Sequence, residues 1–421
     1  MSTEQSVPAL DAPPMARDNP LTRSWAGMIG LGTLAIIFLI CFGSIPFTFA
    51  SPKGETVTSR YESGIPRQAL LPPAWWPKDD EHVRRTVAAA PSDALDAAIE
   101  RVANDTGKRP SQVANATDTD TLRALLKELG SDAPSFVLGS DALGRSLLVR
   151  LLAGGTISLA VGIAAAFISV LIGTLYGAAA GYAGGRIDAF MMRIVDVLYG
   201  LPYILLVVLI AVAADGAIDR WQRSNIERVT AQREAYVEAA LAAHPSPGPE
   251  VREQLEAEAL SRFGTGELSG PQRTRIDVLA LLLAIGGVSW LTMARVVRGQ
   301  VLSLKAQPFV ESARAIGAPI HWIFLRHLLP NLLGPIIVYA TLTVPQAILQ
   351  ESFLSFLGIG IKPPLPSWGN LAADGLSELN RHRSHWWLLF FPCLLLGVTL
   401  LALNFVGEGL REAFDPRRAR R

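Results

Sequence analysis

Long apolar runs recur along the chain and dominate its pattern. A run of about 18 or more apolar residues is long enough to cross a bilayer as a helix. Six such runs occur, at 24–45, 155–180, 191–213, 276–296, 328–350 and 386–407. The pattern predicts an all-α polytopic membrane protein with six transmembrane helices and both termini on one side.

Composition narrows the possible function classes. Hydrophobic residues make up 50% of the chain and charged residues only 18%, whereas soluble domains carry about a quarter charged residues. The net charge of +1 gives no basic excess, so nucleic acid is not expected as a partner. Cys41 and Cys393 both lie inside apolar runs, which argues against a disulfide scaffold and a cysteine zinc site.

Arginine and lysine residues near the ends of the runs predict the orientation. A six-span topology places most of them on one side with both termini: Arg17, Arg23, Arg186, Arg193, Arg295, Arg298, Lys305, Arg314, Arg326, Arg411, Arg417, Arg418, Arg420 and Arg421. Because cytoplasmic loops carry an excess of these residues, we expect the tails 1–23 and 408–421 to be cytoplasmic. An alternative for the first run is a cleaved signal peptide, although Thr48-Phe49-Ala50 matches the cleavage pattern poorly.

Two long segments fall on the opposite, external side, at 46–150 and 214–275. The first opens with prolines and glycines and then becomes helical in pattern, with Leu122, Leu125 and Leu129 at amphipathic spacing. The second has the pattern of two amphipathic helices broken at 245–249. We expect two helical insertions, each either an accessory cap or, with slight preference, a docking surface for an external partner.

The segment 298–330, between the fourth and fifth runs, carries the most informative pattern. Glu311 and Ala313 lie at the start of a short helix, where the helix dipole favours a carboxylate. Gly317 is placed to end that helix just after its C-cap, and Pro319 fits the first position of the next helix. Small residues around a glycine bend would leave a shallow surface for the groove of another protein.

The same segment resembles the coupling loop of bacterial ABC importer permeases. That loop reads Glu-Ala-Ala, three residues, Gly, nine residues, Ile, any residue and Leu-Pro. This chain places at those positions Glu311, Ser312, Ala313, Gly317, His327, Leu329 and Pro330. Ser312 and His327 depart from the general pattern, and the run RHLLPN at 326–331 is similar to the dipeptide, oligopeptide and nickel branch.

Other segments carry the same resemblance. The runs ESFLSFLGIGIKPPLPSWGNL and LNFVGEGLREAFDPR are similar to the second permease subunit of peptide importers. The resemblance covers most of the chain outside the two insertions, which are departures from the family's usual short loops.

The resemblance implies a type I ABC importer permease, and within it the second, C-type permease subunit of a peptide importer in the bacterial inner membrane. The implied partners are a second homologous permease subunit, two ABC ATPase subunits, a periplasmic peptide-binding protein and the lipid bilayer. The chain has no G-x-x-x-x-G-K-[ST] loop, so it cannot bind and hydrolyse ATP by that route. The resemblance implies that the ATPases bind ATP and Mg and that this chain has no catalytic residue and no cofactor. The residues implied in ATPase coupling are Glu311, Ala313, Arg314, Gly317, His327, Leu329, Pro330 and Asn331.

The substrate implied by the resemblance is a di- or oligopeptide, with nickel or a peptide-like compound as alternatives. A secondary transporter and an intramembrane enzyme are more distant alternatives. The spans hold no H-E-x-x-H motif and no pairing of Ser with Lys or His, which argues against the enzyme.

Ionisable residues in the spans are further candidates. Asp196 and Glu351 are assigned to a possible translocation path, since intramembrane charges commonly mark one. For Asp196 the alternative is a local ion pair with Arg193, three residues earlier on the same helix.

The segment before the sixth run holds a His382-x-x-His385 pair. On a helix these side chains would share a face, as metal ligands do. No carboxylate or cysteine lies within a turn of them, so no metal site is predicted. The adjacent Trp386 and Trp387 fit an aromatic belt at the membrane interface.

Overall fold

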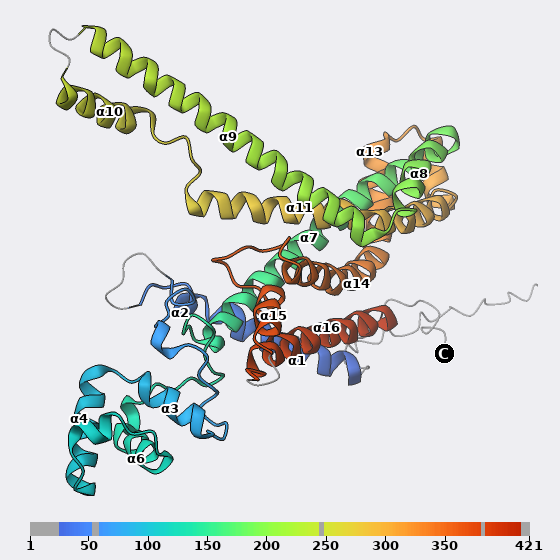
Figure 1. Ribbon diagram of the computed structural model, residues 1–421. Helices are drawn as coiled ribbons and strands as arrows, with labels where there is room; N and C mark the ends of the chain where they lie inside the picture. The colour runs from blue at the N-terminus through green and yellow to red at the C-terminus, as the bar shows by residue number, and fades with distance from the viewer. Residues whose placement is uncertain (1–24, 53–58, 244–247, 380–383, 414–421) are drawn as a thin grey trace, which may run out of the picture.

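The computed structural model describes residues 25–52, 59–243, 248–379 and 384–413, and in these ranges it is helical with no strand longer than an isolated bridge. The helices are α1 (Trp25–Gly43), α2 (Ile45–Thr48), η2 (Pro66–Gln68), α3 (Asp80–Ala88), α4 (Ser92–Thr106), α5 (Pro110–Ala114), α6 (Thr119–Leu129), η3 (Gly130–Asp132), α7 (Leu147–Ala183), α8 (Gly185–Tyr199), α9 (Tyr203–Ala243), α10 (Pro249–Phe263), α11 (Gly270–Leu304), α12 (Pro308–Ala315), α13 (Ile320–Ile323), η4 (Phe324–Leu328), α14 (Leu329–Phe356), α15 (Trp368–Ser377) and α16 (Trp387–Ala413). The predicted all-α fold class is confirmed (Figure 1).

Five helical segments are long and apolar enough to cross a membrane, and a bent pair of helices brings the number to six if it forms one span. The five are Trp25–Thr48, Leu147–Ala183, Gly270–Leu304, Ile320–Phe356 and Trp387–Glu412. These segments support the predicted multi-pass membrane protein. The tails at 1–24 and 414–421 lie outside the described residues.

The third predicted span is wrong as a single continuous helix. The run 191–213 crosses the junction of α8 and α9, which meet at an angle of 90°. Pro202 explains the break, because proline has no N–H to donate within a helix and disfavours helical geometry in the residue before it.

Helix α7 lies at the centre of the membrane part and packs along α11. Glycines allow this approach: a Cβ on Gly177 of α7 would lie 2.3 Å from the carbonyl oxygen of Ala294 in α11. Gly30 plays the same part where α1 meets α16, because its Cβ would lie 2.7 Å from the oxygen of Ala402. Small residues of this kind are typical of helix contacts in membranes.

The first insertion contains a small helical unit, α3–α6, with its own apolar core. The core side chains are those of Val83, Val87, Ala98, Ile99, Val102, Val113, Leu122, Leu125 and Leu129. Asp79 and Asp118 cap α3 and α6 by accepting hydrogen bonds from the amides of His82 and Thr121. The predicted helical character of this segment is confirmed.

The second insertion contains the expected pair of helices, since α9 ends at Ala243 and α10 begins at Pro249. Helix α9 continues without a break from Tyr203 to Ala243, so the membrane segment and the outer segment form one rod of 41 residues. Helix α10 folds back along it (Figure 1), and the Arg273 guanidinium of α11 ties the base by an ion pair of 2.7 Å to Asp219. We call α9 and α10 the hairpin.

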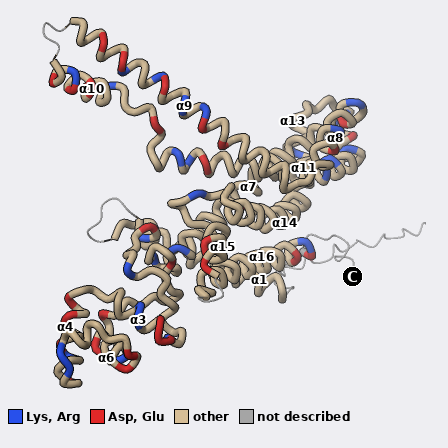
Figure 2. The backbone as a smooth tube through the Cα atoms, in the orientation of Figure 1, with Lys and Arg blue, Asp and Glu red and all other residues tan. Residues whose placement is uncertain are grey.

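The insertions lie at one end of the bundle and the basic loops at the other. Figure 1 shows the α3–α6 unit and the hairpin apart from each other at the end opposite α8 and α13. Charged residues gather on these parts and around α8 and α13, whereas α14 and most of α16 carry few (Figure 2). This separation agrees with the sidedness that the arginines predict.

Replacing Gly177 by Ala is expected to lower the free energy of unfolding by about 1–3 kcal/mol, because the added methyl overlaps the backbone of α11. Gly287→Ala is the matched control, since a Cβ there meets nothing within 4 Å, and it should stabilise by roughly 0.5–1 kcal/mol. Thermal unfolding of both variants in the same detergent measures the difference. Equal midpoints would contradict the close approach of α7 and α11.

Candidate functional site

The loop between α11 and α14 is built around a closed helix end. Helix α12 ends in a Schellman motif: the N–H of Ala318 donates to the carbonyl oxygen of Ala313 (3.1 Å), and the N–H of Gly317 donates to that of Arg314 (2.9 Å). Gly317 has φ +77°, a backbone conformation that L-residues seldom adopt. The predicted C-terminal glycine is therefore confirmed.

The next helix starts one residue later than expected. Pro319 has φ −68° and ψ 150°, so it is the N-cap of α13 and Ile320 is the first helical residue. The fifth predicted span also begins earlier than residue 328. A π-helical turn, η4, joins α13 directly to α14, so the apolar segment runs from Ile320 to Phe356.

Two buried residues of α12 fasten the loop to the bundle. Val310 and Ala313 pack in a cluster with Val297 and Val301 of α11 and Leu328 at the start of α14. The loop is thereby anchored to both helices that flank it. A force applied to α12 would be transmitted through this cluster to α11 and α14.

The outer face of the loop is exposed and mixed in chemistry. Glu311, Arg314 and Gly317 are exposed, and Ile316 beside them is 80% exposed. The Arg314 guanidinium lies 5.0 Å from the centre of the Tyr182 ring, which orients it across the end of α7. Phe309, Ile320, Trp322 and Leu325 of the same segment are also exposed, and exposed apolar side chains gathered in one segment favour contact with another protein.

The remaining predicted coupling residues form the base of the loop. His327 is half-buried, with its ring near those of Trp322 and Phe309. Its carbonyl oxygen accepts a hydrogen bond of 2.6 Å from the Asn331 side chain. Leu329 is half-buried and Pro330 exposed, both in the first turn of α14. His327 and Asn331 therefore support the loop, and Glu311 and Arg314 present its surface.

Ion pairs join α8 to α11 near the same end. The Arg298 guanidinium donates to both carboxylate oxygens of Asp188, at 2.5 and 2.6 Å. Asp196 pairs with Arg295 at 2.8 Å. The local ion pair with Arg193, which the sequence offered as the alternative for Asp196, is not formed. Helix α11 packs beside α8, and the Arg295 guanidinium, which lies 4.0 Å from the centre of the Tyr199 ring, reaches Asp196 across the two helices.

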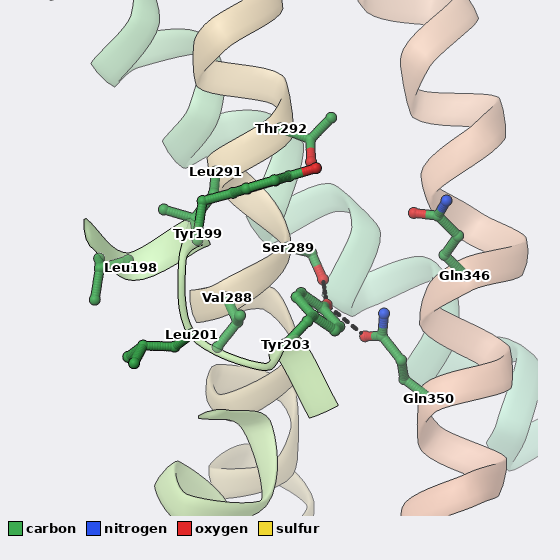
Figure 3. Close-up of a pocket in the computed structure, with 10 residues that line it drawn as sticks. All are labelled: Leu198, Tyr199, Leu201, Tyr203, Val288, Ser289, Leu291, Thr292, Gln346 and Gln350. Carbon is green, nitrogen blue, oxygen red and sulfur yellow. Dashed lines mark hydrogen bonds between the residues drawn. The ribbon is translucent and has the colours of Figure 1, made fainter. Parts of the chain in front are cut away.

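A cavity of about 450 Å³ opens where α8 meets α9. Its lining comes from that corner, from the middle of α11 and from α14: Leu198, Tyr199, Leu201, Tyr203, Val288, Ser289, Leu291, Thr292, Gln346 and Gln350 (Figure 3). The described residues that line it contribute hydroxyl and amide groups as their polar groups, and none of them is charged. Such a surface can exchange hydrogen bonds with peptide groups without selecting for charge.

Tyr203 organises this cavity. Its hydroxyl lies 2.6 Å from that of Ser289 on α11 and donates to the Gln350 side chain of α14 at 2.8 Å (Figure 3). One side chain at the start of α9 thus joins three helices. Sequence reasoning missed Tyr203, Gln346 and Gln350, because uncharged polar residues in an apolar run give no signal of their own.

The two acidic candidates for a translocation path lie elsewhere. The Asp196 side chain is 60% exposed at the α8–α11 contact. Glu351 is fully buried and does not line the cavity, although Gln350 next to it does. Serine hydroxyls surround the Glu351 carboxylate, those of Ser352, Ser355, Ser158 and Ser367. The geometry gives Glu351 a packing role between α14, α7 and the N-cap of α15.

The predicted histidine pair is only partly visible, since His382 lies outside the described residues. His385 is buried, with Nε2 3.4 Å from the Arg85 guanidinium and Nδ1 3.4 Å from the Glu378 carboxylate. Burial and the Arg85 charge lower the pKa of His385. Within the described ranges no three His, Cys, Asp or Glu side chains form a metal-binding group.

Residues 170–420 match the family described as binding-protein-dependent transport system inner membrane component. The chain belongs to this family. The match includes α8–α16, and therefore both the loop and the cavity.

Curated relatives are similar over a shorter stretch. The oligopeptide transport system permease protein OppC of Escherichia coli K12 is 52% identical over 141 residues, which is 34% of this chain and 46% of that protein. The dipeptide transport system permease protein DppC of Bacillus subtilis is 47% identical over 137 residues, 32% of this chain and 42% of the relative. The aligned stretch thus spans less than half the length of either relative.

The two acidic residues of α8 are expected to differ in their effect on stability. Asp188→Ala strands the partly buried Arg298 and should lower the free energy of unfolding by about 1–3 kcal/mol. Asp196→Ala, its control on the same helix, removes an exposed pair and should cost less than about 1 kcal/mol. Thermal unfolding in detergent measures both, and a larger loss for Asp196→Ala would contradict this ranking.

Proposed function

We propose that this chain is a transmembrane permease subunit of an ATP-driven importer of di- or oligopeptides. The observation that carries the proposal is the Schellman-closed loop at 308–318, anchored to two spans and exposed at the end opposite the insertions, in a chain of the binding-protein-dependent transport family. The 52% identity to an oligopeptide permease supports the peptide class of substrate.

Energy would enter through the loop. Separate ATPase subunits bind ATP and Mg and grip the exposed face that carries Glu311, Arg314 and Ile316. The buried contacts of Val310 and Ala313 then pass their closing movement to α11 and α14. Nucleotide thereby shifts the population between outward-open and inward-open packings of the same helices.

The substrate would pass along the cavity between α9, α11 and α14. Its hydroxyl and amide lining suits the amide groups that all peptides share, and the lack of charge tolerates different side chains. The loop is anchored to α11 and α14, and both of these helices also line the cavity. A movement of the loop would therefore move α11 and α14 and change the shape of the cavity at the same time.

The other partners follow from sidedness. The end with α8 and α13 faces the cytoplasm with both termini, and the insertions face the periplasm, where a peptide-binding protein delivers the substrate. A second homologous permease subunit would complete the path on the open side of the cavity between α9, α11 and α14. The bilayer concerned is the bacterial inner membrane.

The test is uptake into proteoliposomes that hold the purified transporter, with the binding protein outside and nucleotide inside. ATP-dependent accumulation of a labelled oligopeptide is the expected result. Accumulation of nickel and not of peptide would show that the substrate is nickel, the alternative within the family. Peptide uptake without any ATPase subunit would overturn the ATP-driven mechanism in favour of a secondary transporter.

Gly317→Val is expected to abolish most peptide uptake while the chain still inserts. A β-branched residue at φ +77° is strained by about 1–2 kcal/mol or more, which opens the Schellman turn. Uptake and substrate-stimulated ATPase activity are measured together. Gly317→Asn is the matched control, because asparagine tolerates this conformation and a Cβ there meets nothing within 4 Å. Equal loss in both variants would contradict the conformational explanation.

Tyr203→Phe is expected to slow peptide uptake by up to roughly thirtyfold, since it removes two hydrogen bonds worth about 1 kcal/mol each. Tyr199→Phe serves as control, because its ring lines the cavity and no hydrogen bond of its hydroxyl is found in the described part of the chain. Initial rates at saturating and limiting peptide give the comparison. An unchanged rate in Tyr203→Phe would contradict the proposal that the peptide passes through this cavity.

A further inference from the structure

An exposed aromatic patch lies on the first insertion, outside the membrane helices. Trp75 and Trp76 are 56% and 38% exposed, although tryptophan is usually well buried. The Trp75 Nε1–H donates to the carbonyl oxygen of Val137 at 2.8 Å, and Val137 is itself exposed. We call Trp75, Trp76 and Val137 the tryptophan patch.

The patch continues an apolar stripe of the last span. Phe390, Leu394 and Leu401 are exposed along one side of α16, at spacings of one and two turns. Trp386, one turn before Phe390, contacts its ring with centroids 5.6 Å apart. The Trp76 ring lies 4.8 Å from that of Trp386, so the stripe extends beyond the helix onto the insertion.

This arrangement corrects the predicted aromatic belt. Trp387 is fully buried, with its indole N–H 3.4 Å from the Ser140 carbonyl oxygen, so it cannot face lipid. Trp386 is half-buried under the patch. The exposed indoles at this level are those of Trp75 and Trp76, which are distant in sequence from any span.

The backbone holds the patch rigidly at the end of α16. The N–H of Ala74 donates to the oxygen of Phe136 at 2.8 Å, and the N–H of Leu70 donates to that of Asp141 at 2.9 Å. Pro72, Pro73 and Pro77 restrict the chain on both sides of the two tryptophans. The rings are therefore presented with little loss of conformational entropy on binding.

We propose that the tryptophan patch binds the headgroup region of the outer leaflet beside α16 and holds the first insertion against the membrane. Tryptophan prefers this region because its ring is apolar and its N–H polar. Lipid is the occupant because the patch is continuous with the exposed side of a membrane-spanning helix, at the level where that helix begins. The proposal rests on the membrane fold and is independent of the substrate.

The test places a fluorescent probe beside the patch in the intact transporter in nanodiscs. Cys41→Ala and Cys393→Ser remove the native thiols, and Ala74→Cys, exposed and next to Trp75, carries an environment-sensitive label. Val137→Cys is a second site in case the first disturbs folding. Asp93→Cys on α4 is the water-exposed control and Leu394→Cys on α16 the lipid-exposed one.

Lipids with a headgroup spin label are expected to quench the probe at 74 strongly, and iodide about threefold less than at 93. Adding Trp75→Ser and Trp76→Ser should raise iodide quenching at 74 toward the value at 93. A probe at 74 that behaves like the one at 93 with both tryptophans present would overturn the proposal. Protection from iodide and lipid labels alike would also overturn it, because a polypeptide would then cover the patch.

Discussion

The structure depends on one constraint, that backbone groups inside a bilayer find no water and must be satisfied within the protein. Helices satisfy their own backbone groups, so what varies between helix pairs is how closely their backbones approach. Glycines on α7 let its backbone approach that of α11 almost to contact. Helix α11, which packs along α7 at the centre of the bundle, also lines the cavity and anchors the loop at 308–318.

The same constraint explains where the chain departs from regular helices. Pro202 breaks the third apolar run at the cavity, and a π-helical turn joins the loop to α14. Irregular backbone inside a bilayer is tolerated only where protein or a cavity surrounds it, and the corner at Pro202 lies beside the cavity. The π-helical turn lies at the base of the loop, on the side where the arginines predict the cytoplasm.

Some features of the site can be predicted from the sequence and others cannot. The turn at Gly317 was predictable, because a glycine after a short helix has a local meaning that tertiary contacts seldom override. The partner of Asp196 was not, since choosing Arg295 over Arg193 requires knowing which helices are neighbours. Glu351 looked like a cavity residue from its charge, yet burial among serines removes it from the cavity.

The sequence by itself determined the fold class, most span positions and the loop, because hydrophobic run length and turn chemistry are local properties. Tertiary structure alone decided the cavity joined by Tyr203 and the ion-pair partner of Asp196. It also decided that Trp75 and Trp76, rather than Trp387, are exposed at the end of α16. These features depend on contacts between residues far apart in the chain, and no local pattern encodes them.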